Sequence, residues 1–126
     1  MKINDQTKFI VINRQSNSLY SLIANGQYRS TSLGRGTWKS LIGSEASLQS
    51  NCNKEGFNVE SDMPSYGKVR IGILGDDRPD CSTCDSRIGF GTGGWHDYNN
   101  TCGNEAWNGA DNGNKHIKAM GYILVQ

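Results

Sequence analysis

Val69-Arg70-Ile71-Gly72-Ile73-Leu74 is the stretch of this sequence that most clearly predicts its local structure. Its apolar residues alternate with Arg or Gly, as they do along a β-strand. Gly75-Asp76-Asp77-Arg78-Pro79-Asp80 follows and has the composition of a turn. Arg87-Ile88-Gly89-Phe90-Gly91 then predicts a second short strand. A strand, a turn and a further strand favour a mainly β fold.

Strand signals also dominate the N-terminal part of the chain. Residues 8–13 form a β-branched run, and residues 18–24 form an apolar stretch that ends at Asn25-Gly26, a strong hairpin signal. Together with residues 27–33, these segments predict an N-terminal meander.

A helix and a loop are expected next. Over residues 37–48 the apolar spacing is nearer to that of a helix, with Gly43 as an early stop. Over residues 51–67 the apolar content falls, which favours a loop anchored by Cys52, with Phe57 inserted into the core. One short helix is therefore expected.

The chain ends in a long loop and a closing strand. Residues 91–114 are rich in Gly and polar residues and predict a loop of about two dozen residues. Residues 116–125 become apolar on both faces, which predicts a central strand. The expected class is mainly β, or β-rich α+β. We expect a compact single domain over residues 1–126, with long Gly-rich, disulfide-pinned loops and one short helix.

Composition limits what the chain can bind. Only 35% of its 126 residues are hydrophobic, and it has 16 glycines, which is typical of a loop-rich domain with a small core. The formal net charge of +1 gives no electrostatic footprint for nucleic acid or an anionic membrane. No apolar run approaches the roughly 20 residues that span a bilayer. Nucleic-acid partners and membrane insertion are therefore not expected.

Four cysteines, Cys52, Cys81, Cys84 and Cys102, allow three interpretations: two disulfides, a zinc site, or redox-active or free thiols. An even number in a small, Gly-rich chain predicts two disulfides, with three pairings open. Alternatively, Cys81, Cys84, His96 and Cys102 have the composition of a tetrahedral zinc site, which leaves Cys52 unused. The polar N-terminus lacks the apolar region of a signal peptide, so the chain is expected to be either cytosolic or the mature form of a secreted protein.

The long loop carries the candidate binding site. Rings, amides and carboxylates on a Gly-rich loop suit a sugar, because a ring stacks on its C–H face while the polar groups bond its hydroxyls. The candidate ligand-binding residues are Trp95, His96, Asp97, Asn100, Glu105 and Trp107. The alternative is that the two tryptophans belong to the core.

Calcium is a second expectation for polar turns. Asp76, Asp77, Asp80 and Asp85 fall within ten residues, and Asp111-Asn112-Gly113-Asn114 also offers oxygen ligands. Neither segment matches an EF-hand loop. The alternative is that these acidic turns are only solvated.

No motif predicts an enzyme. The sequence contains no Gly-x-Ser-x-Gly, Walker loop or His-Glu-x-x-His, and Gly89-x-Gly91-x-x-Gly94 lacks the helix of a dinucleotide site. Asp97 and Glu105 could form a carboxylate pair for glycoside hydrolysis. Catalysis is not expected, because a small core offers little of the deep apolar pocket that active sites use.

Six segments form a further pattern: residues 17–23, 51–58, 69–73, Cys84-Asp85-Ser86-Arg87-Ile88-Gly89-Phe90-Gly91, Thr101-Cys102-Gly103-Asn104-Glu105 and residues 115–126. They resemble a C-terminal module of invertebrate, largely cnidarian, extracellular proteins, coral skeletal organic matrix proteins among them. The likeness covers residues 9–126. It implies secretion, disulfides and interaction with glycans or matrix.

The cnidarian modules often follow a fibrinogen-like or intelectin-like region. A more distant similarity connects this chain to the C-terminal part of intelectins. This similarity implies calcium-dependent recognition of sugar diols. Asp85, Ser86 and Arg87 stand where intelectins cluster metal ligands beside a cysteine.

The expected function is that of a secreted lectin which binds a galactose-like or related sugar without catalysis. A homo-oligomer is expected, because linking weak sites raises avidity by ~10²–10⁴. Two alternatives stay open: an extracellular matrix or adhesion module that binds protein partners, and a cytosolic zinc-stabilised domain.

Overall fold

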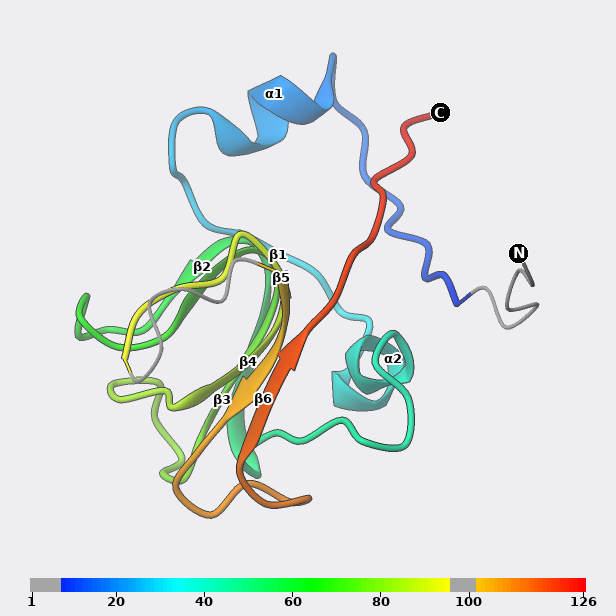
Figure 1. The fold of residues 1–126 in the computed structure, drawn as a ribbon. Helices are drawn as coiled ribbons and strands as arrows, with labels where there is room; N and C mark the ends of the chain where they lie inside the picture. Colours follow the sequence, from blue (N-terminus) through cyan, green and yellow to red (C-terminus); the bar gives the residue numbers. More distant parts are fainter. Residues whose placement is uncertain (1–7, 96–101) are drawn as a thin grey trace, which may run out of the picture.

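Six strands form one antiparallel sheet among the described residues, in the order β1-β2-β3-β4-β5-β6. The structure, a computed structural model, describes residues 8–95 and 102–126. The strands are β1 (Arg29–Ser30), β2 (Asn51–Glu60), β3 (Lys68–Asp76), β4 (Ser86–Phe90), β5 (Cys102–Ala106) and β6 (Lys115–Lys118). The described helices are α1 (Leu19–Ile23) and α2 (Arg35–Ser40). Each strand pairs with its neighbour in sequence, so the sheet is a meander (Figure 1).

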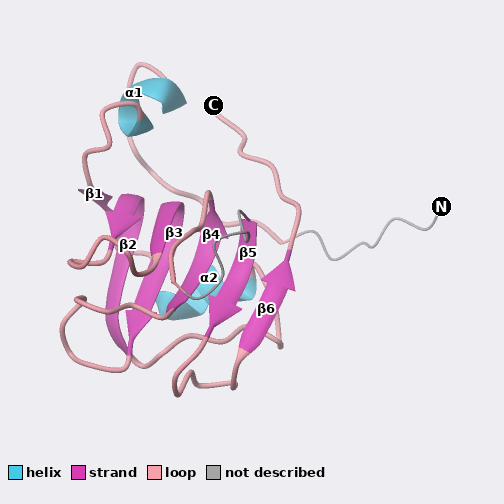
Figure 2. Cartoon of the chain, turned by 60° about the vertical axis from the view of Figure 1, so that its left-hand side comes forward, coloured by secondary structure: helices cyan, strands magenta, loops and turns pink. Residues whose placement is uncertain are grey.

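The sheet is buried on both faces. α2 packs against one face near β3 and β4, as Figure 2 shows. That face holds the larger apolar cluster, which consists of Leu22, Trp38, Ala46, Leu48, Phe57, Ile71, Ile73 and Ile88. A second cluster contains Val59, Val69, Leu74 and Cys84. Ile73 and Leu74 are neighbours in β3 and therefore point to opposite faces. The mainly β class and the single domain are as the sequence predicts.

A row of four glycines crosses the sheet. Gly56, Gly72, Gly89 and Gly103 lie opposite one another on β2, β3, β4 and β5. A Cβ on any of them would lie within 2.2 Å of a carbonyl oxygen of a neighbouring strand. The row allows the four strand backbones to approach closely, which a side chain would prevent.

The expected N-terminal meander is wrong. Residues 8–13 lie outside the sheet, residues 18–24 contain α1, and only β1 joins β2. A capping box starts the helix, because Ser18 Oγ accepts the Ser21 N–H at 3.1 Å and Ser21 Oγ accepts the Ser18 N–H. Gly26 has φ 71° and bonds back to the Ile23 carbonyl, so this Asn-Gly pair ends a helix instead of closing a hairpin.

The expected loop over residues 51–67 is also wrong, although Phe57 does lie in the core. Ten of these residues form β2, the longest strand. Its polar side chains are paired with remote segments: Asn58 Nδ2 donates to the Ile23 and Gln27 carbonyls at 3.2 and 2.9 Å. A strand can therefore be polar in sequence and still be buried.

The helix expected over residues 37–48 begins at Arg35 and ends at Ser40. Its N-cap is Gly34, which has no side chain to cap with. Glu55 instead accepts the Gly34 N–H at 3.0 Å. With α1, the structure has two short helices in its described residues where one was expected.

The C-terminal part differs from expectation in two places. β5 lies within residues 91–114, where a continuous loop was expected. β6 is an edge strand of four residues and not a central one, and residues 119–126 are exposed outside the sheet. Among the described residues, no helix is long and apolar enough to cross a bilayer.

Candidate functional site

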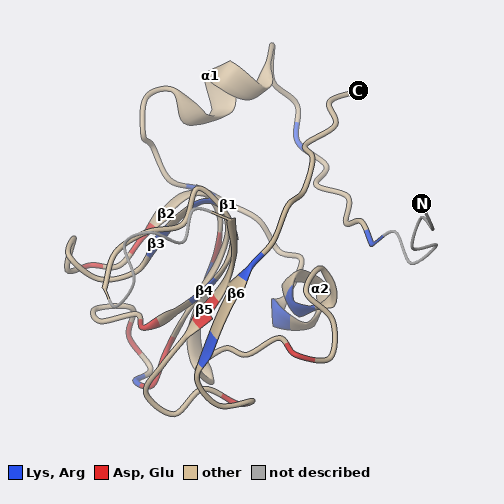
Figure 3. Cartoon of the chain, viewed as in Figure 1, with Lys and Arg blue, Asp and Glu red and all other residues tan. Residues whose placement is uncertain are grey.

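Three charged or titratable residues form a row across one face of the sheet. The register places Arg87 of β4 opposite Glu105 of β5, and Glu105 opposite His116 of β6. Figure 3 shows the acidic segment of β5 beside the basic residues of β6. Asn104, next to Glu105, points to the other face, where its amide bonds Ser47. The row therefore lies on the face away from α2.

Glu105 is a fully buried carboxylate that holds two rings. Its Oε1 accepts the Trp107 indole N–H at 3.0 Å, and its Oε2 lies 2.6 Å from His116 Nδ1. The His116 side chain is 43% exposed. A carboxylate this buried requires such partners, because burying an unpaired charge is costly. Glu105 thus positions two rings and is not itself accessible to a ligand.

Arg87 is also fully buried and bonds the backbone of a third ring-bearing residue, Trp95. Its Nη1 donates to the Trp95 carbonyl at 2.9 Å, and the Trp95 N–H donates to the Ser65 carbonyl at 3.0 Å. Trp95 is 45% exposed, and its ring lies 6.4 Å from the Tyr66 ring, tilted by 49°. The backbone of Trp95 is thus held on two sides, while its ring contacts Tyr66.

We define the aromatic site as Tyr66, Trp95, Trp107 and His116, together with Arg87 and Glu105, the buried residues that bond the last three of them. It combines apolar ring surface with ring N–H groups. Of the residues that the sequence predicts for ligand binding, the structure places Trp95, Glu105 and Trp107 here. His96, Asp97 and Asn100 lie outside the described residues.

Sequence reasoning missed Tyr66, Arg87 and His116 as members of this site. One signal was available. In the apolar strand β4, Arg87 precedes Ile88, so its side chain points to the opposite face. In β5, Glu105 follows Asn104 and likewise points to the face opposite that residue. Opposite charges at inward positions of two short strands indicate a buried polar row.

The four aspartates proposed for calcium make turn contacts. Asp76 is buried, which raises its pKa, and its oxygens accept the Thr83 and Arg78 N–H groups at 3.0 and 3.3 Å. Asp80 accepts the hydroxyl and the N–H of Ser82, and these bonds lower its pKa.

The other two aspartates share one amide. Asn108 Nδ2 lies 3.3 Å from an oxygen of Asp77 and 3.3 Å from an oxygen of Asp85. Among the described residues, only three cysteines bring three possible metal-ligand atoms within 4.8 Å of one another. Asp111, in the other acidic segment, bonds Arg35 and Lys39. Calcium at these residues stays a prediction without geometric support.

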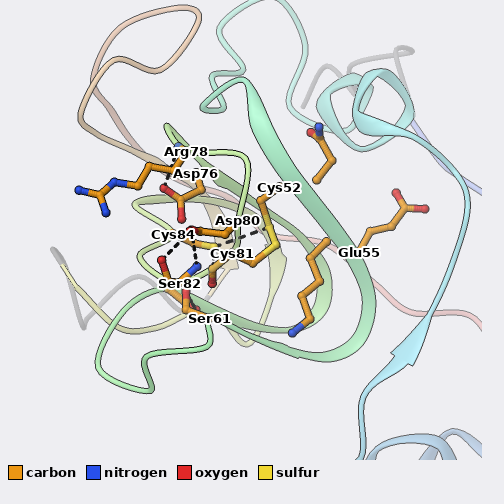
Figure 4. The surroundings of a disulfide bond; sticks show 12 residues. Cys52, Glu55, Ser61, Asp76, Arg78, Asp80, Cys81, Ser82 and Cys84 are labelled. Atoms are coloured by element: carbon orange, nitrogen blue, oxygen red, sulfur yellow. Dashed lines mark hydrogen bonds between the residues drawn. A yellow bond between two sulfur atoms is a disulfide. The ribbon is translucent and has the colours of Figure 1, made fainter.

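The cysteines form one disulfide where two were expected. Cys52 and Cys81 are bonded, with S–S 2.02 Å, and Figure 4 shows their surroundings. Cys84 and Cys102 are thiols. Cys84 precedes β4, whereas Cys102 pairs with Phe90 at the other end of that strand. Strand geometry separates them by roughly 15–20 Å, well beyond the ~7 Å limit for a bridge. The same separation prevents Cys102 from sharing one zinc ion with Cys84.

Burial suppresses the reactivity of both thiols. Desolvation raises the pKa of Cys84 to about 12, and it also raises the pKa of the half-buried Cys102. Cys84 is therefore not a nucleophile at neutral pH, and Cys102 is less reactive than an ordinary exposed thiol.

A cleft of about 310 Å³ lies elsewhere, at the ends of β2 and β3. Its walls include Glu60, Lys68 and Arg70, and Arg70 Nη1 donates to Asn58 Oδ1 at 2.6 Å. Of the predicted ligand-binding residues that the structure describes, Trp95, Glu105 and Trp107, none lines it.

Comparison with known proteins finds no matching family model and no significantly similar curated protein or solved structure. The resemblance to cnidarian extracellular modules and to intelectins therefore stays a prediction.

Proposed function

We propose that this protein is a secreted lectin that binds a galactose-like or related sugar at the aromatic site, without catalysis. One observation supports the proposal: two fully buried charged residues, opposite each other in adjacent strands, bond three ring-bearing residues. Arg87 bonds the Trp95 carbonyl, and Glu105 bonds both Trp107 and His116. Rings immobilised before binding lose little entropy when a ligand arrives, which favours recognition of a small rigid molecule.

The exposed chemistry suits a sugar better than a charged ligand. Trp95 and Tyr66 offer ring surface on which the C–H face of a pyranose stacks. His116 offers a half-exposed ring next to Trp107. The two charged groups of the site, Arg87 and Glu105, are buried, so the groups that reach solvent are neutral apart from His116 when it is protonated.

A glycan array tests the proposal, with Trp95→Ala as the variant and Tyr20→Ala as the matched control. Tyr20 is an exposed aromatic residue on α1, outside the site. We expect Trp95→Ala to weaken sugar binding about tenfold or more at unchanged melting temperature, because it removes a stacking ring. Tyr20→Ala should bind as the wild type does. The lectin proposal fails if the wild type binds no glycan with or without calcium.

The alternative, a matrix or adhesion module that binds protein, is favoured by a different observation. Met120, Tyr122 and Leu124 are exposed after the edge strand β6. Uncharged, apolar chain next to a sheet edge is suited to pairing with another chain. Sedimentation of Met120→Ser/Leu124→Ser against the wild type tests whether the expected homo-oligomer uses this segment. If the substitutions dissociate the oligomer but leave sugar binding intact, association through this segment and sugar recognition are separate functions.

A further inference from the structure

Three sulfur atoms lie together beside β2, although the disulfide uses only two of them. The sulfurs of Cys52, Cys81 and Cys84 all lie within 4.8 Å of one another, and Cys84 Sγ is 3.8 Å from Cys52 Sγ (Figure 4). Cys84 is buried, and the other two are half-buried. The third sulfur raises the question whether it serves thiol exchange or metal binding.

The geometry argues against exchange. A thiolate attacks a disulfide along the S–S axis. For in-line attack on Cys52, the distance from Cys84 Sγ to Cys81 Sγ would be about 5.8 Å, because the 3.8 Å approach adds to an ordinary disulfide bond of ~2.0 Å. The separation is at most 4.8 Å. Cys84 thus lies beside the disulfide and not behind it, and the three sulfurs form a triangle.

The same triangle suits a metal ion. Two thiolates on a tetrahedral zinc with Zn–S bonds of ~2.3 Å lie about 3.8 Å apart. Cys84 and Cys52 already have this spacing. The sulfurs of Cys81 and Cys52 would have to move apart from the ordinary disulfide bond length of ~2.0 Å to the zinc spacing once their bond is broken. Cys81-Ser82-Thr83-Cys84 also has the Cys-x-x-Cys spacing of a zinc knuckle.

The backbone around the sulfurs is held independently of the disulfide. The carbonyls of Cys81 and Cys84 accept the Asp62 and Gly67 N–H groups at 2.9 Å each. Thr83, between the two cysteines, donates its N–H to Asp76. Cys52 lies in β2, which pairs with β3 on one side. Reduction would therefore leave the three sulfurs near one another.

We propose that Cys52, Cys81 and Cys84 bind one thiophilic divalent cation of the zinc class after a dithiol reduces the Cys52–Cys81 disulfide. The dithiol gives up two electrons and two protons and becomes a disulfide, while Cys52 and Cys81 become thiols. Binding of the cation then releases three protons to solvent and forms three metal–sulfur bonds. The described residues supply three ligands, so water takes the fourth position, on the side of the half-buried Cys52 and Cys81.

This site differs from the zinc set expected from sequence, since it uses Cys52 and excludes Cys102. It is independent of the proposed sugar binding. It would give the protein two states, bridged in an oxidising compartment and metal-bound in a reducing one.

Cobalt titration of the full chain tests the proposal. The protein is reduced with excess dithiol, freed of it anaerobically and titrated with Co²⁺. We expect one equivalent to give thiolate-to-cobalt charge-transfer and tetrahedral visible bands, which equimolar Zn²⁺ removes. The oxidised protein should give no such bands, and Cys102→Ser should match the wild type. Cys84→Ser should weaken binding at least tenfold. Bands of equal strength in oxidised protein, or none in reduced protein, would overturn the proposal.

Alkylation of the wild type identifies the ligands without relying on a variant that could fail to fold. Reduced protein is treated with iodoacetamide with and without Zn²⁺ and then mapped by mass spectrometry. At a pH raised toward the thiolate range, zinc should protect Cys52 and Cys81, which reduction exposes to the reagent, and leave Cys102 modified. Protection of Cys102, or no protection of Cys52 and Cys81, would refute the assignment.

Discussion

Gly89 of β4 lies directly opposite Gly72 of β3, and neither position has room for a side chain. A Cβ on Gly89 would lie 2.2 Å from the Ile71 carbonyl oxygen and 2.8 Å from the Gly72 Cα. Gly89 also has φ 149°, a conformation that side-chain-bearing residues rarely adopt. Both obstacles are backbone, so no side-chain rotation relieves them.

Gly89→Ala should therefore destabilise the protein by about 3 kcal/mol or more, or prevent folding, as urea unfolding would measure. The matched control is Gly36→Ala in α2, where a Cβ meets open space. That change should stabilise by about 0.5–1 kcal/mol, because Ala favours a helix over Gly. Equal stabilities for the two variants would contradict the close approach of β3 and β4.

Glu55→Gln should be the most destabilising polar substitution on β2. The buried Glu55 carboxylate accepts the Trp38 indole N–H at 2.6 Å, the Gly34 N–H at 3.0 Å and the Thr31 hydroxyl at 3.2 Å. An amide there has one acceptor oxygen and directs its own N–H groups at donors. We expect a loss of ~2–4 kcal/mol in urea unfolding.

Glu60→Gln is the matched control for Glu55→Gln, since Glu60 ends the same strand and is exposed. It should change the free energy of unfolding by less than ~0.5 kcal/mol. If both substitutions lower the free energy of unfolding equally, the hydrogen bonds of Glu55 to Trp38 and to the start of α2 contribute little to stability.

A helix or strand can be predicted from the local sequence when its own residues determine its structure. β3 and β4 alternate apolar residues with Gly or charge, and both were predicted within two residues. The sequence of β2 favours a loop, because its buried polar side chains have partners far along the chain. Glu55 bonds Trp38, 17 residues away, and no local pattern reveals that contact. The apolar composition of residues 119–125 predicts burial, but the segment is exposed.

The candidate site was predictable only in part, for a similar reason. Trp95, Glu105 and Trp107 were selected because rings and carboxylates suit a sugar. Arg87 and His116 join them through strand register, which sequence alone does not give. The second disulfide was expected from an even cysteine count, but the length of β4 keeps Cys84 and Cys102 apart.

Asp111→Asn should lower stability at neutral pH but not in acid. Burial alone would raise the pKa of Asp111, but bonds from Lys39, the Leu48 N–H and Arg35 outweigh it and hold the pKa below its ordinary value. A lowered folded pKa gives stability that is fully present above the unfolded pKa of ~3.9 and is lost progressively as pH falls from there through the folded pKa.

Thermal unfolding across pH measures this effect. The wild type should exceed Asp111→Asn by about 1 kcal/mol from pH 5 to 7, a modest figure because the carboxylate is partly exposed. The gap should close as pH falls below about 4. Asp62→Asn, at an exposed carboxylate, is the control and should show no such gap. A gap that persists at pH 3 would assign the effect to packing instead of charge.

Counting the free thiols distinguishes one disulfide from two disulfides. Unreduced protein should give two thiols per chain in denaturant, from Cys84 and Cys102, whereas two disulfides would give none. In native protein iodoacetamide should modify Cys102 as pH is raised toward its thiolate range. Cys84 should stay unmodified until the chain unfolds, because burial raises its pKa to about 12. Cys102→Ser should remove the native reaction and leave one thiol in denaturant, and a linked Cys84–Cys102 peptide in the mass map would refute the single disulfide.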